Sequence, residues 1–465
     1  MKRTFIKDAM ALVGQTIVIK GWVVSRRDHG KLMFLDVKDM SGVLQIVLAD
    51  MADSFKGIGN WWVVEIEGVV NERPERLRNP NLETGNIELE AKKVTVVNQA
   101  QVLPIPVEGE GYEITEEARL KYRYLDLRRP RLQDNLRTRA IFMEYIRHFL
   151  KERGFLEIET PALTKSTPEG ARDFLVPSRL DPGMFYALPQ SPQQYKQLLM
   201  LSGIERYFQF PRCFRDEDLR GDRLLEFTQL DIEMAFTFEE EMLQLIEELV
   251  IAMTEALGKR IQEKPFPRMT FQVAMEKYQS DKPDIRRDKT DKDLMAYVWI
   301  THFPMFEEKD DGSVTYTHNP FSAVEEGKRG KMNKDMPREE LLKIRTQQYD
   351  LALNGFEVFG GGIREHNPLN VIAVFEILGY SKKRIQEDFG HLLEAFSYGV
   401  PPHGGIASGL DRWLQAILGE RSIREVVAFP TSGSGKTSVM DSPSHIEQDQ
   451  LDILGITLKK NAHSK

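Results

Sequence analysis

The segment 206–236 of the 465-residue chain places polar side chains inside two strongly apolar stretches. The second stretch alternates apolar residues with four that a strand would display on one face, namely Phe227, Gln229, Asp231 and Glu233. Arg215 ends the first stretch, and its planar guanidinium can bind a carboxylate or a phosphate through two hydrogen bonds. The pattern predicts the floor of an active site on a sheet. An exposed hairpin with surface ion pairs is the alternative, but it leaves the polar residues within apolar strands unexplained.

A second candidate site lies in 349–364, where Asn354-Gly355 is typical of a two-residue hairpin turn. Pairing outward from this turn predicts two opposite pairs, Ala352 with Glu357 and Phe359 with Asp350. Asp350 and Glu357 would then be diagonal neighbours, roughly 7–8 Å apart at Cβ. Two carboxylates so placed suit Mg²⁺, which takes one or two carboxylates together with substrate phosphates. The alternative, that Asp350 and Glu357 are two solvated acids on a hairpin and bind no metal, fits their spacing equally well.

Glycines follow this hairpin and recur near the end of the chain. The run 360–362 would open the backbone to a ligand, and Arg364 comes next as a second cation. In 404–418 a Gly-rich entry leads into a predicted amphipathic helix whose apolar residues recur at helical spacing: Ile406, Leu410, Leu414 and Ile417. Arg412 on this element could meet phosphates, although Gly-rich helix starts are common.

A third element, 191–202, is predicted to be a helix with Ser191 as its N-cap and Gly203 after its end. Gln193 and Lys196 stand three residues apart and share one face of this helix. A helical lysine is usually solvated, so Lys196 matters only if that face looks into a pocket.

The elements that must position these residues form two regions. Residues 16–97 read as about five short strands, which predicts a small barrel of the OB type. A Pro- and Gly-rich segment at 102–115 reads as a linker. Beyond it, helices are predicted at 135–152 and 239–257, and long strands at 205–236 and 349–376. We therefore predict an α+β protein with a barrel at 1–105, a hinge at 106–130, and a helix-flanked antiparallel sheet at 131–465.

Composition narrows the class of protein. The chain has 63 Lys and Arg against 71 Asp and Glu, a net charge of −8, with 41 % hydrophobic residues. A single Cys, Cys213, excludes a disulfide scaffold, and we expect a cytoplasmic protein with no membrane span and no secretory leader. Local charge differs from the total: residues 1–31 hold seven Lys and Arg against two Asp, and residues 119–139 hold eight against two. We expect these two segments to form a path for a phosphate backbone.

Taken together, these segments resemble the three motifs of class II aminoacyl-tRNA synthetases. Residues 154–174 (GFLEIETPALTKSTPEGARDF) are similar to motif 1 and its sequel, FRDED…EF to motif 2, and GLDR at 409–412 to motif 3. The bacterial aspartyl-tRNA synthetases are the most similar, through RLKYRYLDLRRP, ALPQSPQQYKQLLM, THNPF and GFEVFGGGIR. The resemblance covers almost the whole chain.

The resemblance implies a two-step reaction, in which L-aspartate attacks the α-phosphate of ATP and the aspartyl group then passes to the 3′ end of tRNA-Asp. It implies ATP contacts at Arg215, Asp216, Glu217, Phe227, Glu357 and at Gly409, Leu410, Asp411 and Arg412, with Arg215 and Arg412 as the catalytic pair. It implies an aspartate pocket of Glu169, Gln193, Lys196, Arg215, His318 and Arg364. It implies Mg²⁺ on Asp350 and Glu357. Lys196 and Arg364 would pair with the β-carboxylate, whereas the amide of asparagine would leave buried cations unpaired.

The resemblance also implies partners. In the barrel, Arg27, His29, Phe34 and Gln45 match anticodon-reading positions, where an aromatic ring stacks on an unstacked base. His29 in the RRDHG loop resembles enzymes that also charge tRNA-Asn. Pro161 of motif 1 implies a homodimer.

Three departures from the bacterial pattern stand out. About a dozen residues, 285–296, replace the large domain that the bacterial enzymes insert there. Leu224-Leu225 stands where Gln-Pro is usual, and Asn319 replaces the second His of His-His-Pro-Phe. Two alternatives remain: an asparaginyl-tRNA synthetase, which Lys196 disfavours, and a non-catalytic RNA-binding paralogue, which the retained motif residues disfavour.

Overall fold

The computed structural model describes residues 2–30, 32–49, 51–166, 170–219, 223–309, 311–325, 327 and 329–459. The chain divides into two compact units, Met1–Pro106 and Val107–Lys465. Each unit has its own hydrophobic core.

The N-terminal unit is a closed five-stranded barrel with strand order β1-β2-β3-β5-β4, which confirms the predicted architecture. Its elements are η1 (Ile6–Leu12), β1 (Thr16–His29), β2 (Leu32–Asp39), β3 (Gly42–Leu48), η2 (Ala52–Phe55), β4 (Val63–Glu72), η3 (Glu75–Leu77) and β5 (Ile87–Asn98). Alternate residues of β2, β3 and β4 are buried, because a strand turns every second side chain into the barrel. The other side chains face outward and are available to a ligand.

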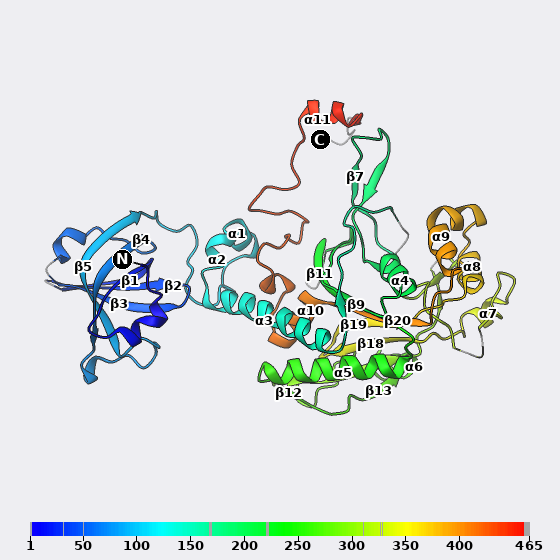
Figure 1. The fold of residues 1–465 in the computed structure, drawn as a ribbon, viewed down its shortest axis with the longest axis horizontal. Coiled ribbons are helices and arrows are strands. Elements are labelled where there is room, and N and C mark those ends of the chain that lie inside the picture. The colour runs from blue at the N-terminus through cyan, green and yellow to red at the C-terminus, as the bar shows by residue number, and fades with distance from the viewer. Residues whose placement is uncertain are drawn as a thin grey trace. The chain divides into compact units, whose positions relative to one another are not determined.

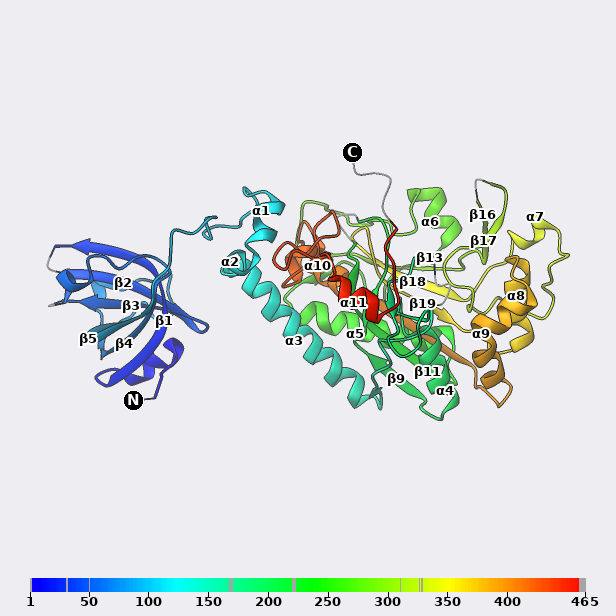
Figure 2. The same cartoon turned by 90° about the horizontal axis from the view of Figure 1, so that it is seen from above.

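The second unit is built on a large mixed sheet (Figures 1 and 2). In spatial order its strands are β13 (Arg268–Thr270), β15 (Tyr297–Thr301), β18 (Gln348–Leu353), β19 (Phe356–Ile363), β20 (His403–Gly409), β11 (Glu226–Ala235), β9 (Arg206–Gln209) and β6 (Leu156–Glu157), with β10 (Arg212–Phe214) paired to β11. Pairing is antiparallel through the centre and parallel at the two edges, β13–β15 and β6–β9. The predicted antiparallel sheet is thus confirmed, with parallel edge strands added.

Helices and three small ribbons surround this sheet. The helices are α1 (Glu116–Lys121), α2 (Arg123–Asp126), α3 (Pro130–Glu152), α4 (Gln193–Leu201), α5 (Glu239–Ala256), α6 (Phe271–Tyr278), α7 (Arg338–Leu341), α8 (Pro368–Ile377), α9 (Lys382–Phe396), α10 (Leu410–Leu418), η5 (Ile423–Val426) and α11 (Gln448–Ile453). The ribbons are β7 (Leu175–Pro177) with β8 (Phe185–Ala187), β12 (Arg260–Ile261) with β14 (Leu294–Met295), and β16 (Phe306–Glu308) with β17 (Val314–Tyr316).

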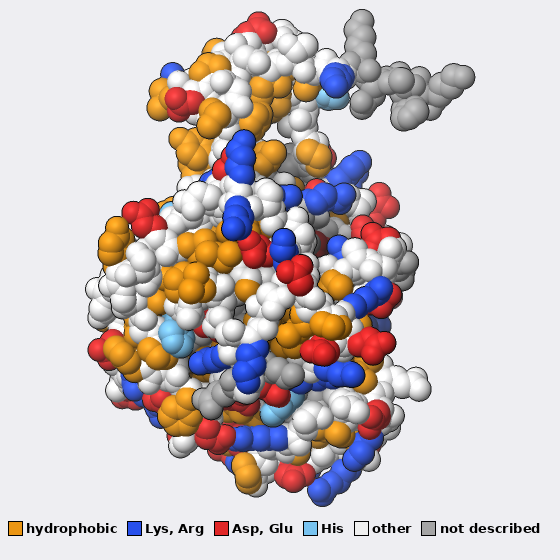
Figure 3. Space-filling model, turned by 90° about the vertical axis from the view of Figure 1, so that its right-hand side faces the viewer, with side chains coloured by type: hydrophobic (Ala, Val, Ile, Leu, Met, Phe, Trp, Pro, Cys, Tyr) orange, Lys and Arg blue, Asp and Glu red, His pale blue; other side chains and the backbone are white. Residues whose placement is uncertain are grey.

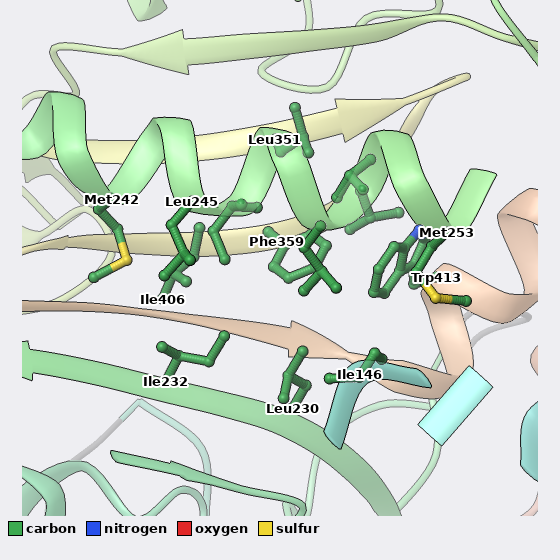
Figure 4. Packing of buried hydrophobic residues seen from close by; sticks show 14 of the residues in the cluster. Ile146, Leu230, Ile232, Met242, Leu245, Met253, Leu351, Phe359, Ile406 and Trp413 are labelled. Atoms are coloured by element: carbon green, nitrogen blue, oxygen red, sulfur yellow. The ribbon is translucent and has the colours of Figure 1, made fainter. Parts of the chain in front are cut away.

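The main core lies between α5 and one face of the sheet (Figure 4). Met242 and Leu245 point from α5 towards Ile406 on β20, whereas Met253 lies at the other end of the helix beside Trp413. Trp413 of α10 joins the same cluster and contacts the ring of Phe359 edge-on. Because strand side chains alternate, the intervening polar residues of β11 and β18 emerge on the opposite face of the sheet.

Three predicted elements need correction. The strand expected at 349–376 ends at Ile363, and the chain continues as α8. Ile406 lies in strand β20 rather than in the helix that follows, which begins at Leu410. Helix α4 begins at Gln193 after Pro192; Ser191 receives a hydrogen bond from the backbone N–H of Gln193 but does not occupy the N-cap position.

The basic segment 119–139 is largely neutralised by the protein itself. Arg119, Arg123 and Arg129 are buried around Asp126, and Arg119 also makes a double hydrogen bond with Glu425 at 2.9 and 2.8 Å. Because these guanidinium groups are buried and paired with carboxylates of the protein, the guanidinium groups cannot form a surface path for a phosphate backbone. The expectation of such a path is therefore wrong for this part of the segment.

Charges of both signs are interspersed on the face of the molecule shown in Figure 3. Within the described residues, no helix is both long enough and apolar enough to span a membrane.

Candidate active site

A cavity of about 1040 Å³ opens on the polar face of the sheet in the second unit. Most of the side chains singled out in the sequence line it: Gln193, Lys196, Arg215, Glu217, Phe227, His318, Asp350, Glu357, Arg364, Gly409, Asp411 and Arg412. They come from α4, β11, β18, β19, β20 and α10 and from the segments that follow β10, β17 and β19, and they are spread over more than 200 residues of sequence. The fold therefore gathers distant motifs into one site.

Two cations and two carboxylates form a buried network at one end of the cavity. Lys196 Nζ lies 3.0 Å from Asp231 Oδ2 and 3.1 Å from Glu233 Oε2. Arg364 Nε lies 3.0 Å from Glu233 Oε1, and its Nη2 lies 3.3 Å from Glu233 Oε2. All four side chains are at most 3 % exposed. The helical face that carries Lys196 thus looks into the pocket, and the lysine is not solvated.

The environment shifts the pKa values of Asp231 and Glu233 in opposite directions. Burial raises the pKa of Asp231, although Lys196 opposes this shift. Burial would raise the pKa of Glu233 too, but the charges of Arg364 and Lys196 outweigh it and bring this pKa down to about 2. Asp231 Oδ1 is buried without a hydrogen-bond partner, so it is an open acceptor beside the cavity.

A glycine in β20 makes room for the Glu233 carboxylate. Gly405 pairs with Glu233 across the sheet, and a Cβ on Gly405 would lie 1.7 Å from Glu233 Oε2. Any larger residue would displace the carboxylate that holds Arg364. The Gly-rich entry to motif 3 therefore has a packing role within the site.

The hairpin of β18 and β19 carries the second pair of carboxylates. Asn354 and Gly355 both have positive φ, and Ala352 lies opposite Glu357, as predicted. A bulge then shifts the register, so that Phe359 lies opposite Leu351 and Asp350 opposite Gly360. The predicted pairing of Phe359 with Asp350 is wrong by this one residue.

The bulge leaves the two carboxylates on either side of a glycine. A Cβ on Gly360 would lie 3.1 Å from Asp350 Oδ1 and 3.2 Å from Glu357 Oε1. Burial, and next the charge of Glu357, raises the pKa of Asp350 well above its usual range, and Asp350 Oδ1 has no hydrogen-bond partner. An open carboxylate oxygen beside a second carboxylate suits a hard cation. Among the described residues no cluster of three or more His, Cys, Asp or Glu could hold a metal.

Aromatic and cationic side chains lie at the other end of the cavity. The guanidinium of Arg215 lies 5.2 Å from the centre of the Phe227 ring, so the two present a flat surface with a positive charge beside it. Glu217 accepts a hydrogen bond of 3.0 Å from Arg223. Arg412 reaches the cavity from the first turn of α10, and its Nη1 donates to the Glu357 backbone oxygen at 3.5 Å.

Other predicted ATP contacts take different positions. Asp411 lines the cavity, but its carboxylate binds Arg139 of α3 and accepts from the Thr228 backbone N–H at 3.1 Å. It therefore ties α10 to β11. Leu410 is fully buried in the main core, and Asp216 pairs with Arg172 at 3.3 Å outside the set of lining residues.

His318 and Asn319 also line the cavity. His318 Nε2 lies 4.0 Å from Asp350 Oδ2, and its ring contacts Phe303 edge-on. Asn319 lines the cavity, and its Oδ1 accepts from the Phe321 backbone N–H. Glu169 lies outside the described residues.

The predicted anticodon residues meet on the outer face of the barrel. Arg27 donates to Asp36 at 2.9 Å and to Gln45 at 3.0 Å, and Gln45 in turn donates to Glu88 at 3.0 Å. The rings of His29 and Phe34 lie edge to face, with centres 5.7 Å apart. Cross-strand pairing of Arg27 with Phe34 brings these groups into one patch.

Sequence reasoning missed several residues of the site. Asp231 and Glu233 were recognised as a polar face, but the strand pattern gave no sign that they hold Lys196 and Arg364. Gln197 and His403 lie behind Gln193 in the wall of the pocket, and Arg139 acts through Asp411. The spacing Gln193–Gln197, one helical turn, is the signal that could have indicated Gln197.

Two protein-family models match the chain, one within each of its two compact units. Residues 115–433 match the family described as tRNA synthetases class II (D, K and N). Residues 17–97 match the OB-fold nucleic acid binding domain described as tRNA_anti-codon.

Individual relatives are similar over nearly the whole chain. The chain is 37 % identical to the Aspartate–tRNA(Asp/Asn) ligase of Natranaerobius thermophilus, covering 99 % of this chain and 100 % of the relative, and 37 % identical to the Aspartate–tRNA ligase of Lysinibacillus sphaericus, covering 96 % and 97 %. The first alignment extends over 595 positions, so that relative is more than a hundred residues longer. The fold is similar to asparaginyl-tRNA synthetase from Pyrococcus horikoshii, with a TM-score of 0.73 at 22 % identity over 92 % of this chain and 98 % of that one.

Proposed function

The chain belongs to the class II tRNA synthetases of the D, K and N group, and on that premise we propose that it is an aspartate–tRNA ligase. It uses ATP to activate L-aspartate as the adenylate and transfers the aspartyl group to the 3′ end of tRNA-Asp. The observation that carries this proposal is the buried network of Lys196, Arg364, Asp231 and Glu233 at the end of a cavity that also holds Arg215, Phe227 and Arg412.

This network refines the basis for choosing aspartate. The two cations are already paired with protein carboxylates, so asparagine would not leave them unpaired as expected from the sequence. Lys196 has three N–H donors and uses two on Asp231 and Glu233, and Arg364 uses Nε and Nη2 of its five donors on Glu233. The unused N–H donors can bind a β-carboxylate, which only accepts hydrogen bonds. The side-chain NH₂ group of asparagine is itself a donor, so it cannot accept hydrogen bonds from them. Asp231 Oδ1 is then an acceptor for the α-ammonium group.

The other end of the cavity suits ATP. Phe227 stacks on the adenine ring, Arg215 binds the α-phosphate and the aspartate α-carboxylate, and Arg412 binds the γ-phosphate. Asp350 and Glu357 would hold Mg²⁺, which the open Asp350 Oδ1 and the gap at Gly360 accommodate. When bound, the ion would neutralise charge on the phosphates.

The reaction needs no nucleophile from the protein. The α-carboxylate oxygen of aspartate forms a bond to the α-phosphorus as the bond to pyrophosphate breaks. Arg215 neutralises charge that develops on the α-phosphate, and Arg412 neutralises the departing pyrophosphate. Holding both substrates in line supplies the remainder of the rate enhancement.

Exchange of pyrophosphate into ATP, measured with each of the twenty amino acids, tests the activation step. We expect exchange with L-aspartate, and exchange with asparagine at least about 100-fold lower in kcat/KM, because a site built around charged donors rejects the wrong isostere by roughly this factor or more. Strong exchange with asparagine but not aspartate would identify an asparaginyl-tRNA synthetase. Exchange with no amino acid, together with tRNA binding, would identify an RNA-binding paralogue.

The barrel supplies the tRNA contacts, and we propose that it accepts both tRNA-Asp and tRNA-Asn. The support is His29, which lies beside the stacking ring of Phe34, and the similarity to ligases whose names include both tRNAs. Reading both would require the patch of Arg27, Phe34 and Gln45 to recognise the anticodon bases that the two tRNAs share. Charging of tRNA-Asp and tRNA-Asn transcripts side by side is the direct comparison.

Phe34→Ala is expected to lower kcat/KM for charging of both transcripts by about 10- to 100-fold, because one base–aromatic stack contributes roughly 1–3 kcal/mol. Exchange of pyrophosphate should stay within about twofold of the wild type, since Phe34 lies in the other compact unit. Val97→Ala, at an exposed apolar side chain of the barrel, is the control and should leave charging unchanged. Equal losses in charging and exchange would rule out an anticodon role for Phe34.

We also propose a cytoplasmic homodimer. Exposed apolar side chains around motif 1 support the dimer: Ile141 on α3, Leu156 on β6 and Leu163, which follows Pro161, are all more than half exposed. A second copy would cover them.

A further inference from the structure

Three side chains, the amides of Gln193 and Gln197 and the imidazole of His403, form a hydrogen-bonded chain in the wall of the pocket. Gln193 Nε2 donates to Gln197 Oε1 at 3.1 Å. Gln197 Nε2 lies 3.1 Å from His403 Nε2, and His403 Nδ1 lies 2.9 Å from the Pro401 backbone oxygen. Gln197 and His403 are completely buried, whereas Gln193 lines the cavity. The chain therefore ends at the place where the amino acid is expected to bind.

The direction of every hydrogen bond in this chain follows from its far end. A carbonyl oxygen only accepts, so the proton must sit on His403 Nδ1. In the neutral ring Nε2 is then an acceptor, which obliges Gln197 to turn its NH₂ group towards it. Gln197 Oε1 is left to accept from Gln193 Nε2. Gln193 Oε1 has no protein partner among the described residues, and it is not among the buried unsatisfied atoms.

We propose that His403 is a positioning residue for amino-acid selection: acting through Gln197, it fixes the Gln193 amide so that Oε1 faces the pocket as an acceptor for the substrate α-ammonium group. This inference rests on the proposed function, since it names the group that a substrate amino acid presents there. Without the relay, the Gln193 amide can turn over and present NH₂ to an ammonium group, which is donor against donor.

The surroundings of His403 keep the ring neutral. Burial lowers the pKa of His403 from its usual value, although the charge of Glu233 opposes this. Arg364 and His366, in the segment after β19, also lower the pKa of His403 electrostatically and so favour the neutral form. On the α9 side the contact is apolar, an edge-on approach of the Phe396 ring at 6.0 Å. A neutral ring is the form in which Nε2 accepts.

The test uses the full-length protein and pyrophosphate exchange, with succinate as a competitive probe because it has both carboxylates of aspartate but no ammonium. His403→Phe and Gln197→Met keep the side-chain size and break the relay. We expect each to raise KM for aspartate about tenfold, the factor of one hydrogen bond to a charged group, with kcat and KM for ATP within about twofold. The inhibition constant of succinate should not change.

Two further variants separate positioning from packing. His403→Gln can offer Oε1 in place of Nε2 as the acceptor, and it should restore KM for aspartate to within about threefold of the wild type. Phe396→Leu alters the packing of the ring without touching the relay, and it should leave KM for aspartate unchanged. Equal weakening of aspartate and succinate, or no rise in KM in either relay variant, would overturn the proposal. A wild-type protein that does not activate aspartate would instead refute the proposed function.

Discussion

Replacing Arg412 by alanine is expected to lower the rate of adenylate formation about 10³-fold while leaving the affinity for tRNA unchanged. Arg412 stands at the first turn of α10, where it lines the same cavity as Asp350 and Glu357 and donates to the Glu357 backbone oxygen. Its positive charge stabilises the pyrophosphate as it leaves. Removing one such preorganised contact costs about 3–4 kcal/mol of transition-state stabilisation. Pyrophosphate exchange measures the first quantity, and filter binding of tRNA measures the second.

Arg421→Ala is the matched control for Arg412→Ala. Arg421 follows the same helix, but its guanidinium lies 4.0 Å from the centre of the Tyr112 ring and does not line the cavity. Exchange in this variant should stay within about twofold of the wild type. Wild-type exchange in Arg412→Ala would refute the role assigned to Arg412, and loss of tRNA affinity would point to a misfolded protein.

Replacing Lys196 by glutamine is expected to reduce kcat/KM for aspartate about 10³-fold and that for asparagine far less. The variant removes the ammonium donor for the β-carboxylate, whereas an uncharged amide loses less. It also leaves Asp231 and Glu233 in a buried site with one cation instead of two, which costs about 3–5 kcal/mol of stability when a buried pair is broken. Exchange assays with both amino acids give the ratio, and thermal unfolding gives the stability.

A double variant, Lys196→Gln with Asp231→Asn, separates the two effects. It removes one charge of each sign, so the unfolding midpoint should recover towards that of the wild type while exchange with aspartate stays low. Recovery of aspartate exchange together with stability would show that Lys196 acts only in the fold. A single variant that retained its preference for aspartate over asparagine would contradict the assigned role directly.

Much of the fold and most of the cavity could be predicted from local pattern. Strand alternation in 16–97 gave the barrel, Asn354-Gly355 gave the hairpin turn with its positive φ values, and the alternation around Asp231 gave a polar face. These features depend on a few neighbouring residues, so the sequence contains the information. The register was predicted correctly as far as Ala352 and Glu357 and incorrectly beyond them, because the local pattern does not reveal the bulge opposite Leu351.

The basic segment 119–139 shows that local sequence does not predict which charged side chains are solvated. The count of eight basic residues in 119–139 is correct, yet the structure buries Arg119, Arg123 and Arg129 against Asp126 and the distant Glu425. Whether a charge is solvated depends on which carboxylates the fold brings to it, and local sequence does not contain these distances.

The amino-acid sequence by itself determined the residue types, the two regions of the chain and the motifs that resemble a synthetase. The tertiary structure alone decided that Lys196 pairs with both Asp231 and Glu233 and that Arg364 pairs with Glu233. It also decided that Asp411 binds Arg139 and the β11 backbone, and that His403 lies behind Gln193. Each of these contacts joins segments tens to hundreds of residues apart. Hydrogen bonds act over about 3 Å, so only the folded chain can specify which groups they connect.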